Sequence, residues 1–180
     1  MTIKHGQLTP PVGADDHAQG NAAAPVTLVE YGDYECPYCG QAYPIVKRIQ
    51  ARLGDKLRFV FRNFPLAEAH PHATAAAEFA EASALQGKFW EMHDTLYEHQ
   101  DALRSSDLMA YAQRLHLDTG KLKDALGEGK AAARVKADFR NGVRSGVNGT
   151  PTFFINGRRF DGDWTDDEAF ADALLEASTG

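Results

Sequence analysis

Cys36 and Cys39 are the only cysteines in the 180-residue chain, and they stand in the spacing C-x-x-C. Three kinds of chemistry use this spacing. The pair could be half of a zinc site, which needs two further ligands. It could close a structural disulfide, which would add little stability because so short a loop has little entropy to lose. It could also be a dithiol that exchanges disulfides. We favour this last interpretation, because no second C-x-x-C completes a metal site, and we keep zinc as an alternative.

The local sequence places Cys36 between a strand and a helix. Residues 26–31 are mostly apolar and β-branched, which is typical of a buried parallel strand, and Gly32 ends the run. Pro37 suits the first position of a helix, because its ring fixes φ and its missing N–H is not needed there. The apolar residues that follow at helical spacing are Ile45, Val46, Ile49 and Leu53.

Such a position would make Cys36 reactive. The thiolate is the nucleophile, and a free cysteine has a pKa near about 8.5. The N–H groups and the positive end of a helix dipole stabilise a thiolate at a helix N-terminus. We therefore expect Cys36 to be the exposed, activated sulfur. Cys39 would lie one turn deeper and resolve the mixed disulfide at Cys36, and Tyr38 between them would tune the reduction potential.

A second informative segment covers residues 147–157. Thr152–Ile155 is apolar and β-prone, and Asn156-Gly157 is a strong signal for a type I′ hairpin with a return strand after it. Pro151 precedes the first of these strands. By propensity alone its peptide bond would be trans, because only about 5–6% of X–Pro bonds are cis.

Two segments carry a resemblance to known proteins, and they stand about 115 residues apart: V-T-L-V-E-Y-G-D-Y-E-C-P-Y-C-G and G-T-P-T-F-F-I-N-G. In them the chain resembles the DsbA-like thiol–disulfide oxidoreductases of the thioredoxin superfamily. The resemblance implies an α/β protein with a thioredoxin fold and a helical insertion. The core would comprise about residues 25–65 and 147–180 and the insertion about 66–146, within a single domain of residues 13–180. Residues 1–12 are expected to form a flexible N-terminal segment.

The resemblance also implies roles around the cysteines. Cys36 would be the attacking cysteine and Cys39 the resolving one. Glu30 falls where the superfamily places a buried acid, which is thought to help move a proton off the resolving cysteine. The alternative for Glu30 is a solvated carboxylate, but a charge inside an apolar run is rarely there without a partner. Pro44 matches the proline that kinks the active-site helix.

A substrate-binding surface is implied as well. Pro151 would be the cis-proline that faces the disulfide, which reverses the expectation from propensity, and Thr150 would contact the substrate backbone. Pro37 and Tyr38 would contact substrate between the cysteines. The substrates would be protein or peptide disulfides. No metal or organic cofactor is required beyond the redox-active disulfide, and glutathione or a partner reductase would recycle the pair.

Two departures from DsbA itself bear on the direction of electron flow. The chain has Pro-Tyr between its cysteines where DsbA has Pro-His, and Thr150 stands where DsbA has Val. Loss of that histidine removes a donor to the thiolate. We expect a reduction potential near roughly −200 mV rather than about −120 mV, and hence a reductase or isomerase more than an oxidase. A redox-inactive, peptide-binding chaperone module on the same fold is the alternative.

Composition disfavours other classes of function. The net charge is −6 and no run of Lys and Arg is longer than two residues, so we expect no nucleic-acid partner. No apolar run reaches about 18 residues, so we expect no membrane span. The first 25 residues lack the apolar core of a secretory signal, which predicts a cytoplasmic location.

The segment between the two motifs predicts helices. Residues 73–86 are rich in alanine, and apolar residues recur at helical spacing over 89–97, which indicates the core of the insertion. Val143 is expected to face inward from the last helix of the insertion. Further on, Thr165 with Glu168 predicts a capping box.

One histidine pair within this segment could suggest a metal. His70-Pro71-His72 stands at a predicted helix start, but no carboxylate or cysteine follows at ligand spacing. A surface or capping role is therefore favoured for both histidines.

Overall fold

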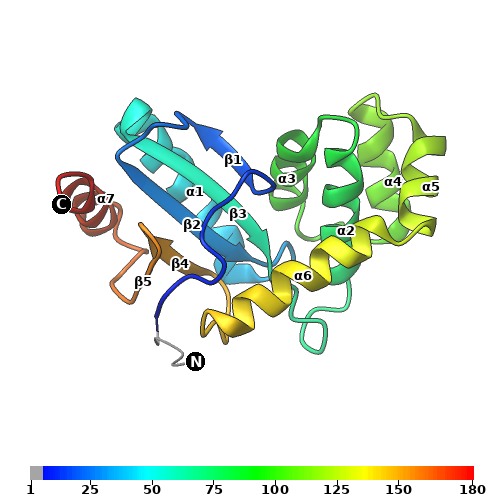
Figure 1. Ribbon diagram of the computed structural model, residues 1–180. Coiled ribbons are helices and arrows are strands. Elements are labelled where there is room, and N and C mark those ends of the chain that lie inside the picture. Colours follow the sequence, from blue (N-terminus) through cyan, green and yellow to red (C-terminus); the bar gives the residue numbers. More distant parts are fainter. Residues whose placement is uncertain (1–5) are drawn as a thin grey trace. The chain divides into compact units, whose positions relative to one another are not determined.

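The sheet of the protein has five strands (Figure 1). The computed structural model describes residues 6–180. The strands are β1 (His17–Gly20), β2 (Val26–Gly32), β3 (Leu57–Asn63), β4 (Thr152–Ile155) and β5 (Arg158–Phe160). Their order in the sheet is β1-β3-β2-β4-β5, and β1 with β3, β2 with β4 and β4 with β5 pair antiparallel. The strands predicted over residues 26–31 and 152–155 and the return strand after Asn156-Gly157 are confirmed, whereas β1 has no apolar alternation and was not predicted.

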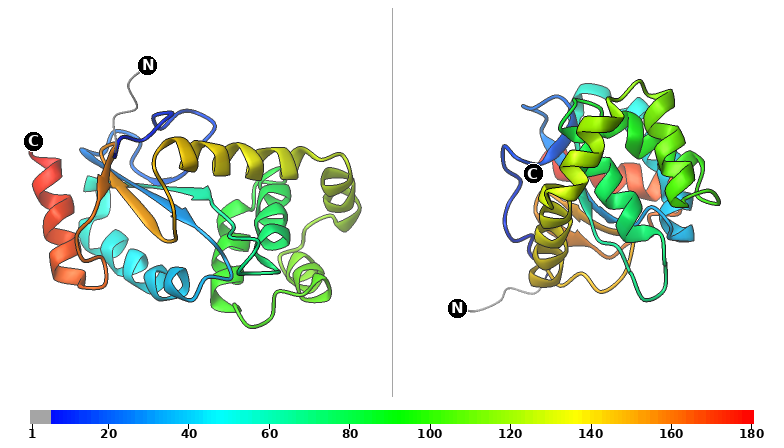
Figure 2. Two further views of the ribbon diagram at one scale, coloured as in Figure 1. Left: turned by 90° about the horizontal axis from the view of Figure 1, so that it is seen from below. Right: turned by 90° about the vertical axis from the view of Figure 1, so that its right-hand side faces the viewer.

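Helix α1 spans Pro37–Leu53, and from residue 41 on it packs on one face of the sheet (Figure 2). From residue 41 on, its buried residues are Ala42, Ile45, Val46, Ile49 and Leu53, which include the whole predicted stripe. Pro44 lies inside the helix, as the resemblance implied. The short 3-10 turn η1 (Gly54–Lys56) follows, and Gly54 at φ +52° ends α1 in a conformation that glycine adopts without strain.

Helix α7 (Asp167–Ser178) packs against β2. Asp166 caps it, because its carboxylate accepts the N–H groups of Glu168 and Ala169. The predicted cap at Thr165 is wrong by one residue, since a carboxylate at 166 already reaches both N–H groups of the first turn. The largest fully buried side chains of the sheet unit include Tyr31, Phe59, Phe61, Phe153, Phe154 and Phe170.

Five helices make up the predicted insertion. They are α2 (Ala73–Ala84), α3 (Phe89–Glu98), α4 (Ser105–Arg114), α5 (Thr119–Gly127) and α6 (Lys130–Arg144). Helix α2 packs against α3, α4 and α5 (Figure 1). Val143 is 56% exposed, so the prediction that it faces inward is wrong; Gly142 is the buried residue of that turn. Within residues 6–180, no helix combines the length and the apolar character that crossing a membrane requires.

The described chain divides into two compact units. The first, here called the sheet unit, comprises residues 6–32, 41–62 and 140–180, and the second, the helical unit, comprises residues 33–40 and 63–139. The C-x-x-C segment, 33–40, groups with the helices and not with the sheet, because side chains and backbone groups of the helical unit bind it directly.

Residues 6–12 are part of the sheet unit. Leu8 is 4% exposed, and its N–H donates to the carbonyl of Gly157 at 2.8 Å. The N–H of Arg159 donates to the carbonyl of Gly6 at 2.8 Å. The predicted flexible segment is therefore wrong for residues 6–12, because they satisfy backbone groups that the outer strand β5 would otherwise expose. Residues 1–5 lie outside the described residues.

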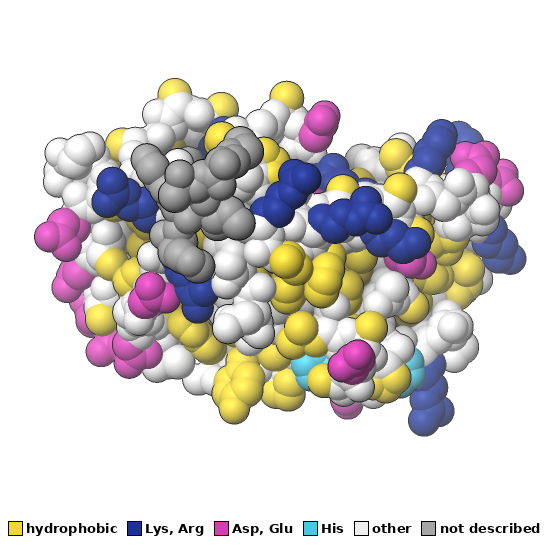
Figure 3. Space-filling model, turned by 60° about the horizontal axis from the view of Figure 1, so that its bottom comes forward, with side chains coloured by type: hydrophobic (Ala, Val, Ile, Leu, Met, Phe, Trp, Pro, Cys, Tyr) yellow, Lys and Arg dark blue, Asp and Glu magenta, His cyan; other side chains and the backbone are white. Residues whose placement is uncertain are grey.

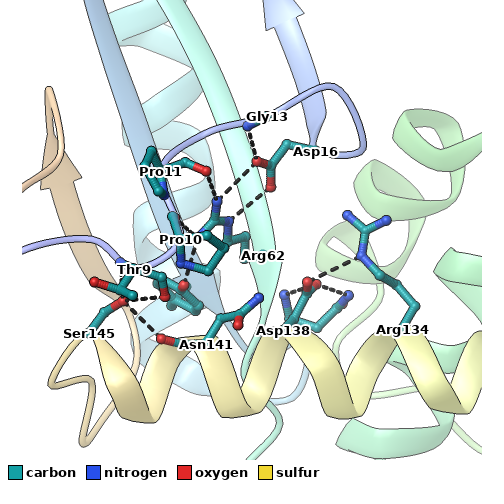
Figure 4. Close-up of polar contacts among 12 residues, drawn as sticks. Thr9, Pro10, Pro11, Gly13, Asp16, Arg62, Arg134, Asp138, Asn141 and Ser145 are labelled. Atoms are coloured by element: carbon teal, nitrogen blue, oxygen red, sulfur yellow. Dashed lines mark hydrogen bonds and ion pairs between the residues drawn. The ribbon is translucent and has the colours of Figure 1, made fainter.

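Arg62 is a buried cation that holds the N-terminal segment on β3 (Figure 4). It forms a bidentate pair with Asp16, with Nε–Oδ1 at 2.9 Å and Nη2–Oδ2 at 3.0 Å. Its remaining N–H groups donate to the carbonyls of Pro10 and Pro11 and to the hydroxyl of Tyr31. Burial disfavours the charge, but the Asp16 and Tyr31 contacts outweigh burial and raise the pKa of Arg62.

Asp138 is a buried carboxylate of α6, within the helical unit (Figure 4). Its Oδ2 accepts both the backbone N–H and the side-chain amide of Asn63, and its Oδ1 accepts Nε of Arg134 at 3.2 Å. Burial raises the pKa of Asp138, and nearby Glu81 adds to the rise, although Arg134 and Asn63 oppose it. The amide of Asn63 also donates to Glu81, so it separates two acids in the core.

Replacing Arg62 by Met is expected to lower the free energy of unfolding by about 3–5 kcal/mol, because Asp16 would stay buried without its counter-charge. Urea unfolding monitored by circular dichroism measures the change. The matched control is Arg58→Met on the same strand, whose partly exposed side chain should matter by less than about 0.5 kcal/mol. A loss below about 1 kcal/mol in Arg62→Met would contradict this account of the ion pair.

Candidate functional site

Cys36 directly precedes α1, whose first residue is Pro37, so the predicted strand-to-helix junction is confirmed. Cys39 is fully buried, and the N–H of Asp33 points at its sulfur, with N–Sγ at 3.5 Å. Tyr38 is 65% exposed. The expectation of an exposed Cys36 is wrong, because this residue is only 3% exposed. The reason lies in the contacts that the loop makes within the helical unit.

The carboxylate of Asp33 organises this loop. Its Oδ1 accepts the N–H groups of Glu35 at 2.8 Å and of Cys36 at 3.2 Å. Its Oδ2 accepts the N–H of Leu66 at 2.9 Å and faces Nδ1 of His70 at 2.7 Å. The Asp33 side chain is fully buried. It is therefore a buried carboxylate with four donors, two from its own turn and two from the segment that precedes α2.

His70 is held against this carboxylate with its side chain 19% exposed. An ionised carboxylate only accepts hydrogen bonds, so Nδ1–H of His70 is the donor. Burial lowers the pKa of His70, but the hydrogen bond and charge of Asp33 outweigh burial, and the Cys36 and Glu35 charges add to them. The net effect is a raised pKa, which favours an imidazolium at this position.

A second carboxylate–histidine pair lies beside the first. Oε2 of Glu35 accepts the backbone N–H of His72 at 2.6 Å, and Oε1 lies 3.2 Å from Nδ1 of His72. His72 occupies the N-cap position of α2 without a cap from its own side chain. His72 thus stands at the predicted helix start without capping it through its side chain, and His70 is only partly exposed, because Asp33 binds it from the loop.

Gln100 fixes the other side of the loop. Its Nε2 donates to the carbonyls of Tyr34 and Cys36, both at 2.9 Å. The side chain reaches them by passing over Gly40, where an added Cβ would lie 1.9 Å from Oε1 of Gln100. A side chain at residue 40 would therefore have to displace the end of the Gln100 side chain. Together the segment 66–72 and Gln100 hold the loop from two sides, which accounts for the burial of Cys36.

The aromatic stripe of α3 packs behind the loop. Tyr34 lies against His93 and Tyr97, with ring centroids 5.6 Å and 4.9 Å away. The buried residues of α3 are Phe89, Met92, His93, Leu96 and Tyr97, so the prediction that residues 89–97 form insertion core is confirmed.

Three further predicted site residues lie in the sheet unit. Glu30 of β2 is 2% exposed and pairs in register with Phe153 of β4, so the predicted burial of this acid is confirmed. The peptide bond between Thr150 and Pro151 is cis, and the chain enters β4 at the next residue.

The outer surface supplies apolar contacts as well as charges. The large exposed hydrophobic residues are Tyr38, Leu85 and Val143. On the face drawn in Figure 3, Lys and Arg side chains are interspersed with acidic and apolar ones. Among residues 6–180, no group of three or more His, Cys, Asp or Glu is arranged to hold a metal ion.

Sequence reasoning missed the partners of the loop. Asp33 and Glu35 stand two residues apart, as do His70 and His72, and each acid pairs with the histidine 37 residues further on. The equal spacing of acids and histidines was a usable signal. Gln100 carried no such signal, because a single glutamine in the turn after α3 has no pattern that indicates its partner.

Comparison with known proteins places the chain in context. A family model described as thioredoxin matches residues 13–175. A curated relative from Salinispora arenicola, named Na(+)/H(+) antiporter NhaA 1, is 48% identical over 174 residues, which are 96% of this chain and 26% of that protein. One from Herminiimonas arsenicoxydans, named Na(+)/H(+) antiporter NhaA, is 41% identical over 172 residues, 95% of this chain and 27% of that protein. The chain thus spans about a quarter of the length of these relatives.

Solved structures are similar over nearly their whole length. A thioredoxin-like oxidoreductase from Silicibacter pomeroyi has a TM-score of 0.82 at 26% identity, over 93% of this chain and 95% of that one. Oxidised BdbD from Bacillus subtilis has a TM-score of 0.80 at 25% identity, over 98% of both chains. The thiol-disulfide exchange protein alpha-DsbA2 from Wolbachia pipientis has a TM-score of 0.79 at 20% identity, over 91% and 87%.

Replacing Gly40 by Ala is expected to lower the free energy of unfolding by about 1–3 kcal/mol, because the methyl group would displace Gln100. In a Gln100→Ala background the same change should cost nothing, or stabilise by up to about 1 kcal/mol through helix propensity. Urea unfolding of the four proteins gives the coupling between the two sites.

The control for propensity alone is Gly127→Ala in α5, where an added Cβ meets nothing within 4 Å. It should have the same small effect with and without Gln100. Strictly additive effects of the Gly40 and Gln100 substitutions would show that the close approach does not constrain residue 40.

Proposed function

Since the chain belongs to the thioredoxin family, in its DsbA-like branch, we propose that it is a thiol–disulfide oxidoreductase whose reacting pair is Cys36 and Cys39. The family match and the structural similarity confirm the predicted α/β thioredoxin fold with a helical insertion. The observation that carries the proposal is the position of Cys36 at the start of α1, three residues before Cys39. The proposal concerns this chain alone, because the curated relatives are about four times as long.

The reaction would run by two exchanges. The Cys36 thiolate attacks a substrate disulfide, forms a mixed disulfide and releases one substrate thiolate. The Cys39 thiolate then attacks Sγ of Cys36 and releases the second substrate thiolate. The substrate disulfide is reduced to two thiols, while Cys36 and Cys39 are oxidised to a disulfide. Two glutathione molecules, or the dithiol of a partner reductase, would reduce the pair again.

Other residues keep the roles that the resemblance implied for them. Glu30, as a buried acid, would help take the proton from Cys39. Thr150 and Pro151 would bind the substrate backbone. The 65% exposed ring of Tyr38 supports its proposed contact with substrate, which Pro37 beside it would share. Protein or peptide disulfides are the proposed substrates, with no metal or organic cofactor.

The direction of electron flow belongs to the same proposal. Tyr38 between the cysteines and Thr150 before the proline favour a reductase or isomerase over a strong oxidase. In the cytoplasmic location expected from the sequence, a pair with a glutaredoxin-like potential would rest largely as a dithiol.

Cys36→Ser is expected to abolish reduction of insulin by dithiothreitol-recycled protein, because the attacking thiolate is lost. Cys39→Ser should instead accumulate a mixed disulfide with substrate, visible by mass spectrometry as a covalent adduct at Cys36. Turnover is measured as the onset of insulin turbidity.

Wild-type protein without turnover that still prevents insulin from aggregating, equally well in Cys36→Ser, would contradict the enzyme and support the chaperone alternative. Adduct formation in the Cys36→Ser variant would contradict the assignment of the attacking sulfur.

The reduction potential of the pair is expected near roughly −200 mV. Equilibration with mixtures of reduced and oxidised glutathione, followed by alkylation and mass spectrometry, measures it. A value near about −120 mV would contradict the reductase direction and indicate an oxidase.

A further inference from the structure

We propose that His70 is a positioning residue for the nucleophile: held on the Asp33 carboxylate, it cancels the negative charge of that carboxylate beside Cys36 and so favours the Cys36 thiolate. The inference rests on the proposed function of Cys36 and deepens it by naming the cation that activates the sulfur. Tyr38, which stands between the cysteines, is not a cation, and the segment before α2 supplies the imidazole.

The need for a cation follows from the contacts of Asp33. Its fully buried carboxylate accepts the N–H of Cys36 at 3.2 Å, so a negative charge sits beside the residue that must itself become an anion. Like charges this close disfavour each other, and burial weakens screening by water. Without compensation, Asp33 would raise the pKa of Cys36 and leave it as a thiol.

His70 is placed to provide that compensation. Its Nδ1 lies 2.7 Å from Oδ2 of Asp33, on the oxygen that does not bind the Cys36 N–H. The Cys36 charge is among those that raise the pKa of His70. A coupling between two charges acts equally on both, so the same interaction lowers the pKa of Cys36 when His70 is protonated.

The other titratable groups that face His70 within the helical unit are acidic, so they cannot supply the positive charge in its place. They are the carboxylates of Asp33 and Glu35 and the thiol of Cys36. Glu35 binds His72, whose side chain is 43% exposed. The Cys36 N–H donates to Asp33 and not to Glu35. His72 is therefore a matched control: the same residue type, in the same segment, with the same kind of partner.

The sign of the pH dependence follows. The imidazolium of His70 is present below its raised pKa and is lost as pH rises through that value. The thiolate of Cys36 is present above the pKa of the sulfur. His70 thus activates Cys36 at pH values between the pKa of the sulfur and the raised pKa of His70. This activation disappears above the pKa of His70.

The first experiment compares His70→Gln and His72→Gln in the full 180-residue chain, with the Cys36 pKa measured from thiolate ultraviolet absorbance. His70→Gln is expected to raise this pKa by about one unit, a tenfold loss of thiolate below both pKa values. The same tenfold change corresponds to a potential about 30 mV lower in the glutathione titration. His72→Gln should shift the pKa by less than about a third of a unit.

A second measurement needs no variant of the histidine. Nuclear magnetic resonance titration of the His70 imidazole is expected to give a pKa about one unit higher in the reduced wild type than in Cys36→Ser, where no thiolate forms. Equal values would overturn the proposal, as would an unchanged Cys36 pKa in folded His70→Gln.

The outcome separates this inference from the proposed function. If insulin is turned over but the Cys36 pKa is the same in wild type and His70→Gln, the role of His70 is overturned and the oxidoreductase function stands. A Cys36 pKa that depends on His70 in a protein without turnover would support the electrostatic coupling and contradict the enzyme.

Discussion

One buried carboxylate fixes the reactive turn. The two oxygens of the Asp33 side chain accept four hydrogen bonds, two from its own turn and two from the segment before α2. They thereby join two parts of the chain. A carboxylate buried without such donors would cost several kcal/mol, whereas donors to a charged group form its stronger hydrogen bonds. The conformation at Cys36 is therefore set by the fold before any substrate binds. Gln100 completes this by fixing the two carbonyls of the turn.

The same carboxylate creates a conflict between structure and chemistry. The N–H groups of the turn need the Asp33 carboxylate as their acceptor, whereas the thiolate of Cys36 would be a second anion beside it. At 3% exposure, Cys36 has little water to screen that repulsion. A histidine on the far oxygen of Asp33 resolves the conflict, because it leaves the hydrogen bonds to the turn intact and removes the net charge. Because Cys36 is buried, its thiolate depends on His70 to offset the charge of Asp33.

The parts of this design that could be predicted are those with local signals. The strand before Gly32, the helix that begins at Pro37 and the turn at Asn156-Gly157 each follow from a few neighbouring residues. The pairing of Asp33 with His70 joins residues 37 positions apart, and only the folded insertion brings them together. Burial of Cys36 was missed for the same reason: helix position predicts reactivity, but exposure depends on what the rest of the chain places over the loop.

The sheet unit contributes through strand register. A slip of one residue between β2 and β4 would turn Glu30 to the opposite face, because side chains alternate along a strand. Asn156 prevents this slip. Its side-chain oxygen accepts the N–H of Thr27, and its own N–H donates to the carbonyl of Thr27, both at 2.9 Å. With φ +47° it also forms the turn into β5. Asn156, directly after β4, thus supports the register that holds Glu30 in the core.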